Sequence, residues 1–121
     1  MAIPFKVDLS REVVAITGGG GVLCGMMARA LAECGARVAI MDLRAEAAEK
    51  VAAAICQAGG QAIGVGCNVL EKASLEQSNA VVEKELGPIS LLVNGAGGNH
   101  PKGTTSKEYL LPEDLDKTVE G

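Results

Sequence analysis

The feature that most constrains this chain is an apolar segment that runs directly into four consecutive glycines. Residues 12–17 have the pattern of a buried strand, Gly18 to Gly21 follow, and a helical pattern begins directly afterwards. A strand that ends in glycines lets the backbone approach an anionic ligand, and the next helix offers unpaired N–H groups and the positive end of its dipole. The sequence therefore predicts the phosphate-binding turn of a βαβ unit. The simpler alternative is that these glycines serve only a tight turn and close helix packing.

The rest of the chain alternates strand patterns with helix patterns. We expect strands at 12–17, 36–41, 61–65 and 89–93, and helices at 23–34, 45–58 and 72–86. Glycines that follow each helix act as stops. This alternation predicts an α/β fold, a Rossmann-type doubly wound parallel sheet in the order 3-2-1-4 that ends after strand four. We also expect a polar loop over 94–111 and a further helix that starts at Pro112.

Composition excludes several classes of function. The chain has 121 residues, 48% of them hydrophobic, which suits one domain. Its net charge of −4, without a basic run, argues against nucleic acid or an anionic membrane as partner. It contains neither a signal-peptide pattern nor an apolar stretch of spanning length, so we expect a cytoplasmic protein. Four cysteines without a Cys-x-x-Cys pair are interpreted as small buried thiols, and no metal site is expected.

Asp42 supports the interpretation of the glycine turn as part of a ligand-binding site. It ends the expected second strand, 42 − 18 = 24 residues after Gly18. An acidic residue at about this spacing meets the adenosine ribose of NAD, and its charge repels the 2′-phosphate of NADP. NAD is therefore favoured over NADP. An N-cap of the next helix is the simpler role for Asp42, and Arg44 is the one nearby cation that would favour NADP.

Three motifs in this order resemble the short-chain dehydrogenase/reductase family. They are Thr17-Gly18 with the glycine turn, Cys67-Asn68-Val69 after the third strand, and Asn94-Gly95-Ala96-Gly97, which is similar to the family's Asn-Asn-Ala-Gly motif. The resemblance implies an NAD(P)-dependent oxidoreductase that transfers hydride between the nicotinamide and a hydroxyl or carbonyl group of a small-molecule substrate. The cofactor-binding residues that it implies are Gly18, Gly20, Gly21, Val22, Leu23, Asp42, Leu43, Asn68, Val69, Asn94, Ala96 and Gly97. A flavodoxin-like mononucleotide domain would leave Asp42 and the last motif unexplained.

The chain also departs from the family pattern. Cys24 stands where the last glycine of the loop is usual, so its side chain is expected to crowd helix against strand or cofactor. Asn68 replaces an aspartate and keeps a carbonyl acceptor for adenine. The segment from Gly97 to Lys102 resembles the branch of sugar-acid oxidoreductases that act on mannonate or fructuronate. There Lys102, with His100, is a candidate for attracting a substrate carboxylate, and a solvated loop with incidental charge is the alternative.

The catalytic residues of the family cannot be assigned in these 121 residues. Its chemistry needs a serine and a Tyr-x-x-x-Lys pair, but the one tyrosine, Tyr109, has Glu113 four residues later. We therefore expect residues 1–121 to be the N-terminal half of a single dinucleotide-binding Rossmann domain, without turnover alone. Homo-oligomerisation, or association through the edge of strand four, is expected. A non-catalytic nucleotide-binding or association module is the alternative.

Overall fold

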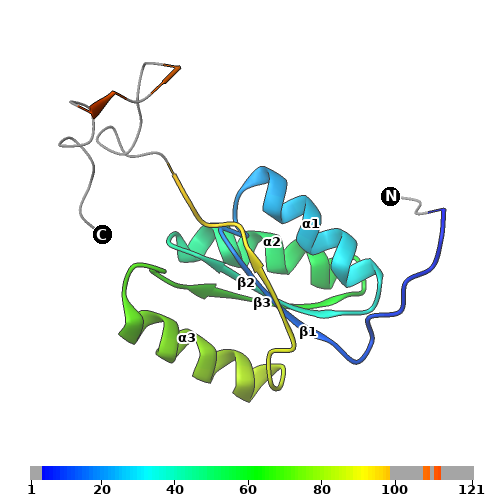
Figure 1. Cartoon of the computed structure of the whole chain (residues 1–121). Coiled ribbons are helices and arrows are strands. Elements are labelled where there is room, and N and C mark those ends of the chain that lie inside the picture. Colours follow the sequence, from blue (N-terminus) through cyan, green and yellow to red (C-terminus); the bar gives the residue numbers. More distant parts are fainter. Residues whose placement is uncertain (1–3, 99–107, 110, 113–121) are drawn as a thin grey trace.

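The computed structural model describes residues 4–98, 108, 109, 111 and 112. It contains a four-stranded parallel sheet in the order β3-β2-β1-β4, covered by helices (Figure 1). The elements are β1 Val13–Thr17, α1 Val22–Glu33, β2 Arg37–Asp42, α2 Ala45–Gln57, β3 Gln61–Gly66, α3 Lys72–Glu85 and β4 Leu91–Asn94. The Rossmann-type fold class and the strand order predicted from the sequence are confirmed.

Element boundaries differ from expectation mainly at β4, which starts at Leu91 rather than at residue 89. The hydroxyl of Ser90 accepts a hydrogen bond from the Val13 N–H at 3.0 Å, and it donates to the carboxylate of Glu12. A side chain thus takes the bond that a strand carbonyl would otherwise accept, and the regular β1–β4 ladder begins only at Leu91.

The sheet separates two layers of apolar side chains. β1 and β2 are buried along nearly their whole length, as expected for central strands covered on both faces. Alternate side chains point to opposite faces because the strand period is two. One core cluster contains Val14, Ile16, Val38 and Ile40 with residues of α1 and α2. The other contains Val13, Ala15, Ala39 and Met41 with Val82 of α3.

In two helices the sheet covers only part of the apolar stripe. In α1 the buried residues are Gly25 and Ala28, whereas Met27 is 42% exposed. In α3, Ser78 and Val82 are buried, whereas Leu75 is 37% exposed. Ser78 is accommodated because its hydroxyl donates to the carbonyl of Gly66 at 3.4 Å. Helical periodicity identifies a stripe of side chains but does not tell how much of that stripe the sheet covers.

The cysteine prediction is correct for one residue of four. Cys67 is buried just after β3, Cys24 and Cys34 are partly buried, and Cys56 is exposed. Cys56 lies near the end of α2, where its thiol donates to the Ala62 carbonyl at 3.4 Å. Among the described residues, no helix is long and apolar enough to span a membrane. His100, Lys102 and the helix expected after Pro112 lie outside the described residues.

Candidate functional site

The sequence-predicted cofactor-binding residues all lie at one edge of the sheet. Parallel strands share the direction of their carboxyl ends, and the register pairs Thr17 with Met41 and with Asn94, and Asp42 with Gly66. The glycine turn, the β2–α2 connection, the start of the β3–α3 connection and the segment after β4 therefore converge on one rim (Figure 1). This is the edge at which ligands of open α/β sheets bind.

Most glycines of the turn are required by close packing. Gly18 has a φ of +66°, and a Cβ there would lie 2.7 Å from the carbonyl oxygen of Gly95. A Cβ on Gly19 would meet Ile40, and one on Gly20 would meet Ala47, each at 2.8 Å. These three glycines therefore serve close packing, as the simpler interpretation expects. Gly21 differs, because a Cβ there would meet only the Gly18 oxygen, at 3.5 Å.

The start of α1 supplies hydrogen-bond donors that the protein leaves unused. Gly21 is the N-cap residue, and in the described part of the chain no backbone bond uses the N–H groups of Val22, Leu23 or Cys24. The first turn carries no acidic side chain that would repel an anion. Val22 and Leu23 are 85% and 67% exposed, so this helix end is open to solvent. The arrangement can accept a phosphate group.

Asp42 joins the glycine turn to the start of α2. Its Oδ2 accepts a hydrogen bond from the Gly20 N–H at 3.0 Å, and its Oδ1 accepts one from the Arg44 N–H, also at 3.0 Å. The Arg44 Nε lies 3.6 Å from the same Oδ1. The simpler N-cap role is wrong, because Arg44 is the N-cap residue of α2. Each carboxylate oxygen has two lone-pair sites, so Asp42 retains acceptor capacity at the rim.

Thr17 connects the glycine turn to the segment after β4. Its side-chain oxygen accepts hydrogen bonds from the N–H groups of Gly95 at 3.1 Å and Ala96 at 3.2 Å. Thr17 is 6% exposed, so the connection is largely shielded from water. Sequence reasoning used Thr17 only as part of a motif and did not predict this bond. The available signal is that Thr17 ends the predicted first strand and the Asn94 motif ends the predicted fourth, and these two strands are neighbours in the predicted order.

The remaining predicted residues line the rim less tightly. Asn68 forms a turn before α3, in which its Oδ1 accepts from the Leu70 N–H at 3.1 Å. Val69 is 38% and Leu43 73% exposed. Asn94, Ala96 and Gly97 are exposed beyond or at the end of β4. In the described ranges, no three His, Cys, Asp or Glu side chains are grouped as a metal site would require.

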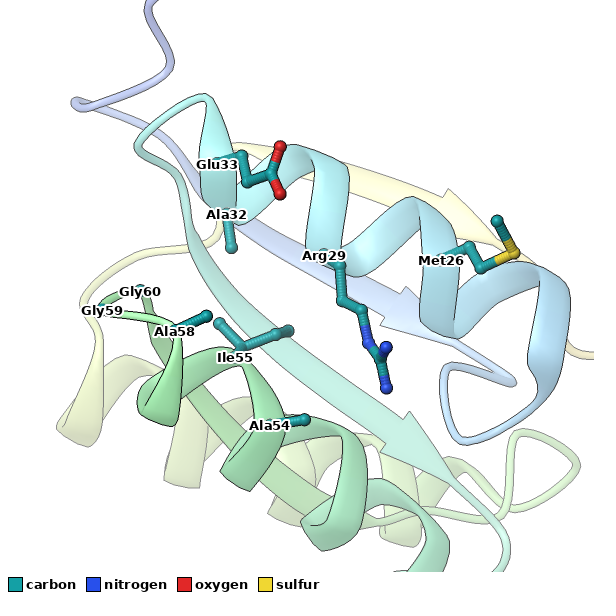
Figure 2. A pocket seen from close by; sticks show the side chains of 9 residues that line it. All are labelled: Met26, Arg29, Ala32, Glu33, Ala54, Ile55, Ala58, Gly59 and Gly60. Atoms are coloured by element: carbon teal, nitrogen blue, oxygen red, sulfur yellow. The ribbon is translucent and has the colours of Figure 1, made fainter. Parts of the chain in front are cut away.

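A pocket of about 610 Å³ lies away from this rim, between α1 and α2 (Figure 2). Arg29 and Ile55 point toward the space between the two helices, and Gly59 and Gly60 lie at one end of it. None of the predicted binding residues lines this pocket. It is called the α1–α2 groove below.

The fold and the rim define a nucleotide-binding domain of Rossmann type. The family model for the short chain dehydrogenase matches residues 12–120. An uncharacterized oxidoreductase of Haemophilus influenzae is 43% identical over 109 residues, which is 90% of this chain and 38% of that protein. The uncharacterized oxidoreductase UxuB of Bacillus subtilis is 44% identical over 106 residues, 88% of this chain and 38% of that protein. The chain therefore belongs to the short-chain dehydrogenase family.

A solved structure gives the same result in three dimensions. A candidate D-mannonate oxidoreductase of Haemophilus influenzae, solved with bound NAD, superposes with a TM-score of 0.76 at 43% identity. The match covers 87% of this chain and 38% of that one. This chain thus spans well under half the length of the relatives that it matches.

Proposed function

We propose that this chain is the NAD-binding portion of a short-chain oxidoreductase, with residues 1–121 forming the N-terminal half of one dinucleotide-binding Rossmann domain. The observation that carries the proposal is the Asp42 carboxylate, fixed beside the glycine turn by the Gly20 N–H and still able to accept further hydrogen bonds. A bound NAD would supply the hydride acceptor or donor for a hydroxyl or carbonyl carbon of the substrate. The family match and the NAD in the related structure support this proposal.

The free N–H groups at the start of α1 fit a pyrophosphate, because they combine unused donors with the positive end of the helix dipole. Asp42 and Leu43 would meet the adenosine ribose. Asn68 and Val69 would flank the adenine, and Asn94, Ala96 and Gly97 would hold the nicotinamide-side ribose. Gly18 and Gly20 act indirectly, since their packing keeps the turn close to β4 and α2.

NAD, rather than NADP, fits the charges around Asp42. Asp42 is 9% exposed, and its carboxylate would face a 2′-phosphate with like charge. Arg44 is the nearby cation, but its guanidinium is already paired with Asp42 and its side chain is 65% exposed. The plainer account of Arg44 is a partner that holds Asp42 in place.

A sugar acid is the proposed substrate class. The support is the resemblance of residues 97–102 to the sugar-acid branch and the D-mannonate name of the related structure. Lys102 and His100 would attract the carboxylate of such a substrate. In a full-length enzyme, Lys102→Ala should raise the Michaelis constant for a sugar acid while leaving that for NAD unchanged. An unchanged sugar-acid constant would remove these residues from the proposal.

The direct test is a fluorescence titration of the 121-residue chain with NADH and with NADPH. NADH should bind more tightly than NADPH. Asp42→Ala should weaken NADH binding by about tenfold or more, because a charge-assisted hydrogen bond and the Gly20 contact are lost. Glu46→Ala is the matched control, since Glu46 is an exposed acid in the first turn of α2. Equal loss in both variants would reject the specific role of Asp42.

The chain alone is proposed to bind without turnover, because it contains no Tyr-x-x-x-Lys pair to move a proton at the reacting carbon. The second candidate is a non-catalytic nucleotide-binding or association module. Adding a second polypeptide that carries the missing pair separates the two. NADH oxidation in the mixture favours the oxidoreductase, and binding without any oxidation favours the module.

A further inference from the structure

Cys24 and Gly95 are two departures from the family pattern that meet in space. Cys24 stands in place of the last loop glycine, and Gly95 stands in place of the second asparagine of the Asn-Asn-Ala-Gly motif. The first lies in the opening turn of α1 and the second directly after β4. They belong to the two segments that border the candidate site.

The sulfur of Cys24 fits against Gly95 because residue 95 has no side chain. A Cβ built on Gly95 would overlap the Sγ of Cys24, whereas it would lie 3.6 Å from the Cβ of Cys24, an ordinary contact. Of the Cys24 atoms, only the sulfur therefore occupies space that a side chain at 95 would need. The same Cβ would also lie 2.6 Å from the carbonyl oxygen of Thr17, so the segment after β4 is confined from two sides.

Both partners of the contact are held by neighbouring residues. Cys24 is partly buried and packs against the core cluster beneath α1. On the other side, a Cβ on Gly18 would reach the Gly95 oxygen at 2.7 Å, and Thr17 holds the Gly95 N–H. Close-packed interiors transmit a change of one atom to their neighbours.

We propose that Cys24 is a positioning residue: its sulfur, matched by the absence of a side chain at Gly95, sets the separation between the start of α1 and the segment after β4. In this proposal, that separation sets the width of the space between the two segments at the rim, which is called the crevice below. The effect on ligand affinity rests on the proposed function, whereas the effect on folding does not. Larger side chains at either position should widen the crevice, and removal of the sulfur should make a side chain at 95 more tolerable.

A double-mutant cycle on the 121-residue chain tests this proposal. The four proteins are the native chain, Cys24→Ala, Gly95→Ala and the double variant, each measured by urea unfolding and by NADH titration. Cys24→Ala removes only the sulfur, and the Thr17 clash is common to both Gly95→Ala proteins, so it cancels in the cycle. Gly95→Ala should reduce the folding equilibrium constant in both backgrounds. The reduction should be at least about tenfold larger in the background that retains the sulfur than in the Cys24→Ala background. Equal reductions in both backgrounds would overturn the proposal.

The control cycle pairs Gly95→Ala with Cys56→Ala. Cys56 is exposed on α2, so the two effects should add. Coupling of similar size in this cycle would assign the effect to the loss of any thiol and would also overturn the proposal.

If Gly95→Ala does not fold, a second set of variants tests the proposal. Cys24→Met lengthens the side chain at the same contact and should weaken NADH binding about tenfold, whereas Cys24→Ser preserves its shape and should retain the native affinity. Cys56→Met is the control. Unchanged affinity in Cys24→Met would refute the positioning role. If the native chain itself does not bind NADH, the proposed function fails, and the unfolding midpoints of these variants still decide the Cys24–Gly95 contact.

Discussion

Thr17 shows how one hydroxyl can hold two segments of the rim. Thr17→Val keeps the shape of the side chain but leaves the Gly95 and Ala96 N–H groups without their acceptor. We expect a loss of about 1–3 kcal/mol in the free energy of unfolding, because unpaired, partly buried donors retain their desolvation cost. Urea unfolding measures it. Thr17→Ser keeps the oxygen and should lose clearly less, so a serine variant as unstable as the valine variant would contradict the assignment.

The carboxyl of Asp8 has a perturbed pKa. Hydrogen bonds from the Ser10 side chain and from the Ser10 backbone N–H lower the pKa of the Asp8 carboxyl. A lowered pKa means that this contact stabilises the fold above the ordinary aspartate pKa and is lost as pH falls through the lowered value. Ser10→Ala should shift the pKa of Asp8 upward, measured by NMR titration of its carboxyl carbon. No upward shift would rule out the Ser10 hydroxyl as the main cause.

β3 and α2 are held together at a glycine. A Cβ on Gly64 would lie 2.5 Å from the Glu49 nitrogen and 2.6 Å from the Ala48 carbonyl carbon, both backbone atoms that cannot turn aside. Gly64→Ala should therefore push α2 off the strand and destabilise the chain by about 1–3 kcal/mol or more in urea unfolding. Gly98→Ala is the control, because a Cβ there meets nothing within 4 Å. Similar losses in both variants would show that generic glycine effects explain the result.

The elements differ in how well sequence could predict them. The apolar run of β1 and the glycines after each helix were sufficient to predict all seven elements and the strand order, because periodicity and helix stops are local signals. The start of β4 was wrong because a side chain, Ser90, replaces a ladder bond. The Cys24–Gly95 contact and the acceptor role of Thr17 join segments far apart in sequence. Contacts of that kind follow from strand order and register together, not from local pattern.

The sheet as a whole has an apolar edge. In the described residues β4 pairs only with β1, and Leu91 and Leu92 are 41% and 59% exposed. Uncovered edges and apolar patches favour association, so the 121-residue chain should form larger species as its concentration rises. Light scattering measures this, and Leu92→Lys should reduce it. A monomer at every concentration would contradict the expectation.

The whole molecule is expected to bind its ligand at the rim and not in the α1–α2 groove. Amide chemical-shift mapping of the 121-residue chain during NAD addition tests this most directly, because none of the predicted binding residues lines the α1–α2 groove. We expect saturable shifts at residues 18–24, 42–44, 68–69 and 94–97, with the groove residues Arg29 and Ala54 unchanged. Shifts confined to the groove, or none that saturate, would contradict it.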